Sequence, residues 1–307
     1  MKDLFKIKLK IAQAIDSKLA RVRPGLRSLG EGDKCRAKFK KLILKIFILL
    51  IFINYNLFSL ELNPTQNSTQ IILVLADRWD STIGILKIFE RKNIQDKWEI
   101  LKDNIFVNFG PNGLGWGVGL HSSELIKIFG GPEVFEGSKR TPTGVFSLNL
   151  AFGKLTQQEL NSKLKYIQIT PNIFAVDDIK SKFYNLIVDE KIVEKDWDSC
   201  EDMFYYMQEG NEQSVANGKR GCGVGLYEYG IVINHNPERI PGKGSNFFIH
   251  VFRELGLPSG GCTTMHPDNM KFLMSWVDLG KNPIIIQLTF DVYYSLKNIW
   301  GLPEVIK

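Results

Sequence analysis

Residues 249–265 read IHVFRELGLPSGGCTTM, and this stretch indicates how the chain folds and which chemistry it supports. His250 stands near the end of an apolar run, and Cys262 follows twelve positions later, directly after Gly260 and Gly261. Because glycine lacks a Cβ atom, the chain can turn sharply there and approach a bound molecule closely. The pattern predicts a strand and a tight turn that bring a histidine and a cysteine together.

Cys262 and His250 are the residue types that nucleophilic catalysis requires. A free thiol has a pKa near ~8.5 and only the thiolate attacks well, so the sulfur needs a base beside it. A histidine can take that proton and return it to a leaving amine. The backbone N–H groups of Gly261 and Cys262 can point at one spot and hold the oxyanion of an acyl transfer. The alternative is an unreactive cysteine packed in the core.

This turn resembles that of the L,D-transpeptidase catalytic domain family (YkuD-like), in which a histidine precedes a Ser/Thr-His-Gly-Cys turn. The matching positions are His250, Ser259, Gly260, Gly261 and Cys262. Two positions depart from the pattern, since Gly260 replaces the turn histidine and Thr264 stands where an arginine is common. These departures bear on the choice of substrate and acceptor.

Two other stretches extend the resemblance and supply further candidate substrate contacts beside Ser259 and Gly260. Residues 139–144, KRTPTG, are similar to the family's Thr-Pro-x-Gly turn, and Arg140 there can bind a carboxylate. A purely structural turn explains the same residues. His235 ends the predicted strand 226–236 at a position where this branch of the family carries a histidine. It is either a cleft residue or a structural one.

The resemblance covers about residues 98–288 and implies an L,D-transpeptidase, a cysteine acyltransferase that acts on peptidoglycan stem peptides without a cofactor. Cys262 would attack the carbonyl of the diamino acid at position three of a stem tetrapeptide, and D-alanine would leave. His250 would serve first as base and then as acid. An amine of a second stem would give a 3→3 cross-link. Water would instead give L,D-carboxypeptidase activity, and a protein lysine would give lipoprotein attachment.

Two other classes of function stay open. The departures at Gly260 and Thr264 also suit a cell-wall binding module without turnover. A metallohydrolase would need the four histidines, but the chain has no H-x-x-x-H or C-x-x-C spacing, so we expect no metal. The glycine-rich residues 110–121 are not followed by Gly-Lys-Ser/Thr, which argues against a nucleotide site.

The positive charge of the chain belongs to its N-terminal end. The 307 residues carry a net charge of +6, but residues 1–41 hold thirteen Lys/Arg against four Asp/Glu. The remaining residues therefore hold 26 basic against 29 acidic side chains, a balance of −3. This distribution gives the main domain no basic surface for nucleic acid.

Residues 42–60, LILKIFILLIFINYNLFSL, contain one charge, Lys45, in nineteen positions. A transmembrane helix needs roughly 20 apolar residues, and basic residues before the run place the N-terminus in the cytoplasm. We therefore expect a basic cytoplasmic tail (1–41), a signal anchor in the inner membrane (42–60), a linker (61–70) and a catalytic domain (71–307). That domain would face the periplasm or cell-wall space. A cleaved signal peptide with a secreted domain, a buried core helix and a misplaced start codon are the alternatives.

Short β-rich segments and frequent glycines predict a mainly β fold, and the resemblance implies a β-sandwich or barrel with a few short helices. We expect strands over residues 71–76, 82–89, 226–236, 247–252 and 283–288, and two more within 98–108 around a turn at 102–104. Helices are expected over 157–164 and from 266 to 280. Residues 199–225 resemble a surface insertion or lid, and the last nineteen residues have no clear signature.

The polar middle of the chain holds two further candidates. Cys200 and Cys222 could form a disulfide in an oxidising compartment, which would leave Cys262 as the free thiol among the exported cysteines. Asp177 and Asp178 could bind an amine, although we favour a solvated pair on the surface.

Overall fold

The computed structural model describes residues 63–207 and 225–305, which belong to one compact unit, Ser59–Lys307. Its strands are β1 Gln70–Ala76, β2 Ile83–Glu90, β3 Glu99–Asn108, β4 Leu114–Trp116, β5 Thr141–Ser147, β6 Leu150–Gly153, β7 Lys165–Gln168, β8 Ile173–Val176, β9 Leu186–Asp189, β10 Cys200–Asp202, β11 Tyr229–Val232, β12 Phe248–Val251, β13 Thr263–Met265 and β14 Ile284–Thr289. The helices are α3 Leu125–Phe129, α4 Gln157–Leu160, α5 Met203–Met207, α7 Pro267–Trp276, the short 3₁₀ helix η1 Leu279–Lys281 and α8 Phe290–Leu296.

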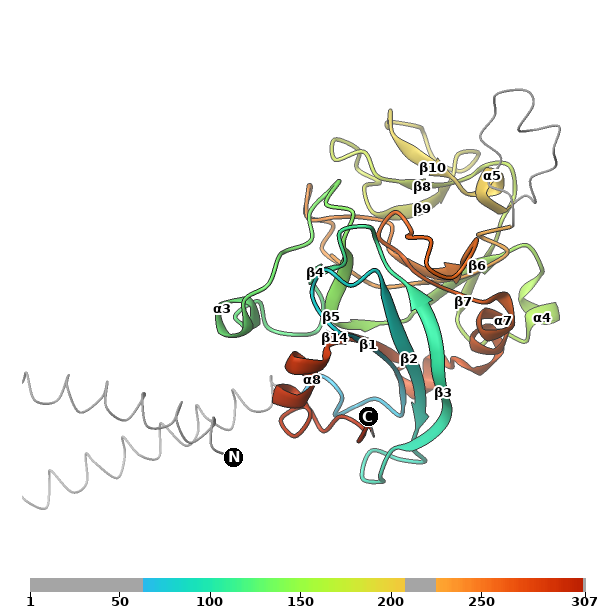
Figure 1. The fold of residues 1–307 in the computed structure, drawn as a ribbon. Helices are drawn as coiled ribbons and strands as arrows, with labels where there is room; N and C mark the ends of the chain where they lie inside the picture. Colours follow the sequence, from blue (N-terminus) through green and yellow to red (C-terminus); the bar gives the residue numbers. More distant parts are fainter. Residues whose placement is uncertain (1–62, 208–224, 306–307) are drawn as a thin grey trace, which may run out of the picture. The chain divides into compact units, whose positions relative to one another are not determined.

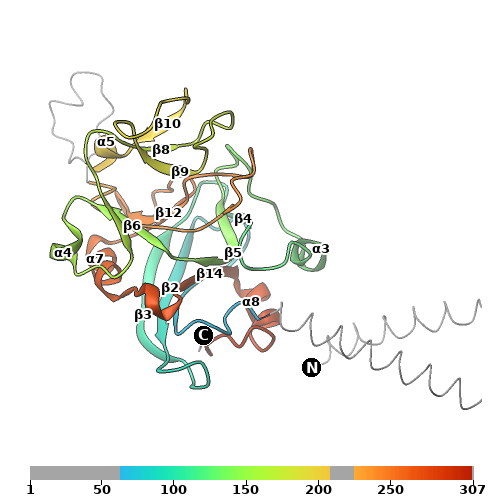
Figure 2. The same cartoon turned by 180° about the vertical axis from the view of Figure 1, so that it is seen from behind.

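Eleven of these strands form one curled sheet in the order β4-β5-β14-β1-β2-β3-β13-β12-β11-β6-β7 (Figure 1). A separate small sheet has the order β10-β8-β9, and both views show it together at one end of the unit, away from α8 (Figures 1 and 2). Strand β12 carries the predicted histidine, and β13 begins directly after the predicted cysteine. Both strands lie inside the large sheet. The site is thus built on strands that have neighbours on both sides.

Strand β1 lies inside the large sheet, between β14 and β2, and helps to explain why the sheet is stable. Its sequence, QIILVLA, is buried at every position, as expected for a strand covered on both faces. Because side chains alternate along a strand, Ile72 and Val74 enter one core cluster, while Ile71 and Leu73 enter the other. β14 pairs with β1 in parallel and β2 pairs with it antiparallel.

The expected architecture is wrong in two respects, although the described residues are mainly β with few helices. The large sheet is a single curled sheet of eleven strands, with a small sheet beside it, rather than a β-sandwich or barrel. No helix among residues 63–207 and 225–305 has the length and apolar character needed to cross a membrane. The longest, α7, has ten residues and so spans about 15 Å, half of a hydrocarbon core of about 30 Å.

This finding corrects the prediction of a transmembrane helix and, with it, the inner-membrane localisation. The long apolar runs that the structure describes, such as β1 and β14, are strands buried in the core. Residues 42–60, on which the membrane prediction was based, lie outside the described part of the chain, as does the basic segment 1–41.

Strand β3 is a single strand where the sequence predicted two. The polar residues 102–104 were interpreted as a turn, but they lie within β3, where Lys102 pairs with Ile88 of β2 and the next two residues fall in a register shift. Lys87 of β2 is buried, and its ammonium group forms an ion pair with the Asp103 carboxylate. Asn104 adopts a left-handed backbone conformation with φ of 56°, which absorbs the irregularity without ending the strand.

Helix boundaries also differ from those predicted. The segment 157–164 forms only the one-turn helix α4, which ends at Asn161 in a left-handed conformation. The C-terminal segment without a clear signature contains α8, whose N-terminus is capped by the Thr289 side chain. Helix α7 begins with Pro267 in its first turn, as expected.

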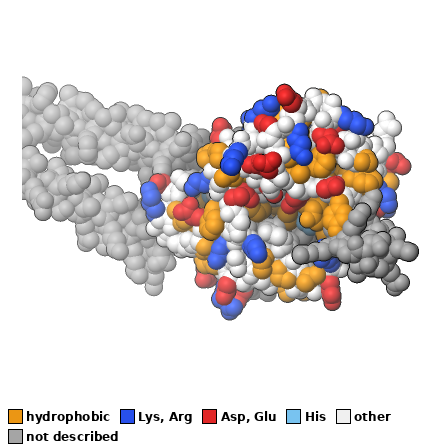
Figure 3. All heavy atoms as spheres, turned by 90° about the horizontal axis from the view of Figure 1, so that it is seen from above, with side chains coloured by type: hydrophobic (Ala, Val, Ile, Leu, Met, Phe, Trp, Pro, Cys, Tyr) orange, Lys and Arg blue, Asp and Glu red, His pale blue; other side chains and the backbone are white. Residues whose placement is uncertain are grey.

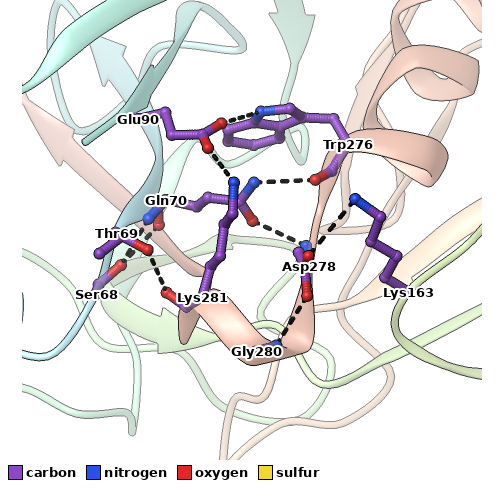
Figure 4. Close-up of polar contacts among 9 residues, drawn as sticks. All are labelled: Ser68, Thr69, Gln70, Glu90, Lys163, Trp276, Asp278, Gly280 and Lys281. Atoms are coloured by element: carbon purple, nitrogen blue, oxygen red, sulfur yellow. Dashed lines mark hydrogen bonds and ion pairs between the residues drawn. The ribbon is translucent and has the colours of Figure 1, made fainter. Parts of the chain in front are cut away.

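A buried polar network fixes the start of β1 to the segment after α7 (Figure 4). The Gln70 amide donates to the carbonyl of Trp276 at 2.9 Å and accepts from the N–H of Asp278 at 2.8 Å. Glu90 accepts hydrogen bonds from the Trp276 indole and from Lys281. Gln70 is 1% exposed, so its amide satisfies two backbone groups that would otherwise be buried without a partner.

Replacing Gln70 with leucine is expected to lower the free energy of unfolding by roughly 2–4 kcal/mol. The reason is that the Trp276 carbonyl and the Asp278 N–H would both lose their partner while the apolar volume changes little. Urea unfolding of the full chain measures the effect, and Gln95→Leu at an exposed position is the matched control. Equal stability of the two variants would show that the network does not hold these segments together.

Candidate active site

Cys262 and His250 lie on the same face of the large sheet. Strands β12 and β13 are parallel neighbours, with His250 opposite Thr264 and Ile249 opposite Thr263. Because side chains alternate along a strand, Cys262, two residues before Thr264, projects to the same side as His250. The predicted base therefore lies in β12, and the predicted nucleophile directly precedes the adjacent strand β13.

Both residues line one pocket with a volume of about 500 Å³. Its wall includes the turn residues Ser259, Gly260 and Gly261, and three acidic residues from distant segments, Glu136, Asp177 and Glu201. Cys262 and His250 are only 7% and 6% exposed, so both reactive groups are largely withdrawn from bulk water. A pocket of this size can hold part of a peptide.

His250 is held as a neutral imidazole. Its Nδ1 lies 2.8 Å from the carbonyl oxygen of Val251, and since a carbonyl only accepts, Nδ1 carries the proton and Nε2 is the basic nitrogen. Burial lowers the pKa of His250 to about 4, against the weaker opposing effect of the Val251 and Leu226 carbonyls. The Tyr227 ring packs edge-on against the imidazole, with centroids 5.0 Å apart.

Cys262 is held as a thiol. Its Sγ accepts a hydrogen bond from the Phe248 N–H at 3.3 Å and lies 3.6 Å from the carbonyl oxygen of Asn246. Burial raises the pKa of the Cys262 thiol well above its usual range, the negative charge of Glu201 raises it further, and the Phe248 N–H opposes both. No hydrogen bond joins the thiol to His250 among the described residues. The resting pair is thus neutral, so proton transfer must accompany attack.

The turn before Cys262 is held by Ser259. The Ser259 hydroxyl donates to the carbonyl of Cys262 at 2.6 Å and accepts from the Gly261 N–H at 3.1 Å. Of the two predicted oxyanion donors, the Gly261 N–H is therefore occupied in the resting structure. For the Cys262 N–H, the described part of the chain offers no acceptor, so this group is the available donor.

The two glycines of the turn serve different purposes. Gly261 has φ of 146°, and a Cβ there would lie 3.0 Å from the Phe247 ring, so the position requires glycine. A Cβ at Gly260 would meet nothing within 4 Å. Gly260 therefore leaves open space at the pocket wall where the resembled family places a histidine.

Two predicted substrate contacts do not line the pocket. His235 is 2% exposed, its Nδ1 accepts from the Val118 N–H, and its Nε2 lies 2.8 Å from the carbonyl oxygen of Lys243. Arg140 donates to the backbone carbonyls of Asn112 and Leu114. Both side chains use their polar atoms to hold loops, and Lys139 lines the pocket in place of Arg140.

Three carboxylates line the pocket, and we call them the acidic wall (Glu136, Asp177 and Glu201). Of these, only Asp177 was a candidate from the sequence. Asp177 follows β8, and Glu201 lies in β10, which pairs with β8. Asp178 instead accepts from the N–H groups of Lys180 and Asp198. Glu201 accepts a hydrogen bond from Tyr227, and burial, aided by the charges of Asp177 and Glu136, raises its pKa to about 7.

Removing the charge of Glu201 is expected to make Cys262 more reactive. In the variant Glu201→Gln, alkylation of Cys262 by iodoacetamide at pH 8 should be roughly three- to tenfold faster, because the thiol pKa falls. Near pH 6 the wild-type carboxyl is mostly protonated, so the two rates should converge. Peptide mapping of the full chain measures the rate at this residue. Glu190→Gln, an exposed carboxylate of the small-sheet region, should leave it unchanged, and a pH-independent rate ratio would contradict the explanation.

Cys200 is half-buried and forms no disulfide with another described cysteine. Its proposed partner Cys222 lies outside the described residues, so the disulfide stays a prediction. Within residues 63–207 and 225–305, no group of three or more His, Cys, Asp or Glu side chains is arranged to hold a metal ion.

Comparison of the chain with family models, curated proteins and solved structures found no match.

Proposed function

We propose that the protein is a cysteine acyltransferase of the L,D-transpeptidase type, acting on peptidoglycan stem peptides. The observation that carries the proposal is the placement of Cys262 and His250 on one face of the large sheet and in one pocket. The sequence motifs around both residues resemble those of that family and supply the substrate class. The absence of a hydrogen bond between thiol and imidazole is compatible with this role, because catalytic contacts often tighten only when substrate binds.

The first half-reaction follows from the neutral resting pair. The Cys262 sulfur bonds to the carbonyl carbon of the third residue while its proton passes to Nε2 of His250. The Cys262 N–H stabilises the oxyanion, an interaction worth roughly 3 kcal/mol in comparable sites. The C–N bond to D-alanine then breaks, and His250 returns the proton to the leaving amine. The product is a thioester on Cys262 and free D-alanine.

The second half-reaction transfers the acyl group to an acceptor. An amine attacks the thioester carbon, its proton passes through His250 to the sulfur, and the C–S bond breaks. An amine of a second stem would give a 3→3 cross-link. Water in the same position would give a free carboxylate and make the enzyme an L,D-carboxypeptidase.

The test is to incubate the full chain with a stem tetrapeptide and follow D-alanine release and intact mass. We expect D-alanine and a protein adduct equal to the tetrapeptide minus D-alanine, located on Cys262. Activity should persist in a chelator, which would exclude the metallohydrolase alternative. A folded protein that binds the peptide without adduct or D-alanine would instead be a binding module.

A further inference from the structure

The acidic wall has no cationic partner in the described part of the chain. The Glu136 carboxylate accepts hydrogen bonds from the hydroxyls of Tyr184 and Ser245 through a single oxygen, Oε2. Asp177 accepts from the Ser199 hydroxyl and Glu201 from the Tyr227 hydroxyl, again through one oxygen each. Neutral donors thus orient all three carboxylates, and one oxygen of each has no partner among the described residues.

The three carboxylates influence one another across the pocket, since the charges of Asp177 and Glu136 both act on Glu201. Like charges held together in a partly buried pocket repel, and an incoming cation relieves this repulsion. The basic residues Lys139 and Arg253 also line the pocket, but no ion pair joins either to the acidic wall. A cation from a ligand therefore has three unpaired carboxylate oxygens available.

A second observation points independently to a polar ligand at this wall. Ser138 and Asn246 line the same pocket and are only 6% and 7% exposed. The Ser138 hydroxyl and the Asn246 amide nitrogen are nevertheless buried without a hydrogen-bond partner in the described chain. Buried polar atoms are normally paired, and rotation of either side chain towards the pocket would let a bound polar group supply the missing partner.

The negative charge of the acidic wall does not continue over the surrounding surface. Figure 3 looks down on the end of the unit that carries the small sheet, and acidic and basic side chains alternate over the surface visible there. A surface of mixed sign does not attract cations from a distance. Recognition of a cation must therefore take place inside the pocket.

We propose that the acidic wall, Glu136, Asp177 and Glu201, is a binding site for the primary ammonium group of a diamino-acid residue. The inference rests on the proposed acyl transfer, because it places the wall in the same pocket as Cys262. The ammonium can belong to the side chain of the donor stem or to the acceptor stem whose amine later attacks. A neutral acetamide in its place would leave the three carboxylates uncompensated.

The donor arm of the test measures binding alone. Full-length protein carrying Cys262→Ala is titrated calorimetrically with N-acetyl-L-Ala-γ-D-Glu-L-Lys-D-Ala, whose only ammonium group is that of the lysine, and with the same peptide acetylated on the lysine side chain as well. We expect about tenfold tighter binding of the free amine. Adding Glu136→Gln or Asp177→Asn should each reduce this preference to about twofold, whereas the control Glu190→Gln should retain it.

The acceptor arm uses chains that keep Cys262. The thioester is partitioned between water and Nα-acetyl-lysine amide, and the ratio of aminolysis to hydrolysis is measured. If the wall holds the acceptor, Glu136→Gln and Asp177→Asn should lower this ratio about tenfold while the two tetrapeptides bind equally. A preference in either arm that both wall variants reduce supports the site and identifies the source of the ammonium.

Failure of this proposal is distinguishable from failure of the proposed function. Equal binding of the two tetrapeptides, or no binding of either, would overturn the ammonium site unless the acceptor arm shows the expected loss. Thioester formation without any preference for the free amine would support the proposed acyl transfer and exclude the ammonium site. A preference for the free amine in a protein that never forms a thioester would support the ammonium site and exclude the proposed acyl transfer.

Discussion

Replacing Cys262 with alanine is expected to lower D-alanine release from a stem tetrapeptide by at least about 10⁴-fold. The loss should be this large because the sulfur forms the bond to the carbonyl carbon that displaces D-alanine. No other described cysteine can substitute, since Cys200 does not line the pocket. Single-turnover assays with the full chain measure the rate, and intact mass shows whether an adduct remains.

The matched control is Cys200→Ala, which removes the other cysteine of the described residues and should change the rate less than twofold. Stability needs a separate measurement, because the Cys262 side chain packs in a core cluster with Phe152 and Phe248. The expected cost of its removal is about 1 kcal/mol, too little to unfold a typical domain. D-alanine release by a folded Cys262→Ala protein at the wild-type rate would exclude the sulfur as nucleophile.

The sequence was sufficient to predict that Cys262 and His250 share a site, and the reason is local. An apolar run that contains a histidine forms a strand, and a glycine pair turns the chain so that the cysteine leads into the next strand. The structure has this arrangement in β12 and β13. Long apolar runs, such as those of β1 and β14, were likewise recognisable because burial on both faces leaves no polar positions.

The acidic wall could not be predicted in the same way. The three carboxylates come from three separate segments of the chain. The pairing of β8 with β10 brings Asp177 and Glu201 together, and the loop that contains Glu136 lines the same pocket. Each looks alone like a solvated carboxylate. Asp177 was a candidate amine contact, but nothing in the sequence distinguishes it from Asp178, which accepts hydrogen bonds from backbone N–H groups instead.

His235 and Arg140 illustrate the opposite case, in which the contacts agree with the structural alternative that the sequence left open. Both residue types suit a binding cleft, and both occur where the resembled family places functional residues. In the structure, however, their polar atoms are used by backbone groups of neighbouring loops. A side chain that holds a loop and one that holds a substrate need the same chemistry, so only the tertiary contacts distinguish them.

Replacing His250 with glutamine is expected to slow thioester formation by roughly 10²–10⁴-fold, the usual contribution of a general base. Glutamine can still donate a hydrogen bond towards the Val251 carbonyl but cannot accept a proton at catalytic pH. The control is His266→Gln, because His266 lies at the N-terminus of α7 and does not line the pocket. The control should react within about twofold of wild type.

The pH dependence distinguishes a catalytic imidazole from a structural one. The pKa of His250 is lowered to about 4 by burial, so the ring stays neutral and basic as the pH falls from 8 to 5.5. Loss of its function should therefore begin only near pH 4, rather than at the ordinary value of 6.5. A titration near pH 7 that disappears in Glu201→Gln belongs to that carboxyl, whose pKa is about 7. A fall in rate centred near 6.5 that persists in Glu201→Gln would show that His250 is charged in the folded protein, and the neutral resting pair inferred for this site would then be wrong.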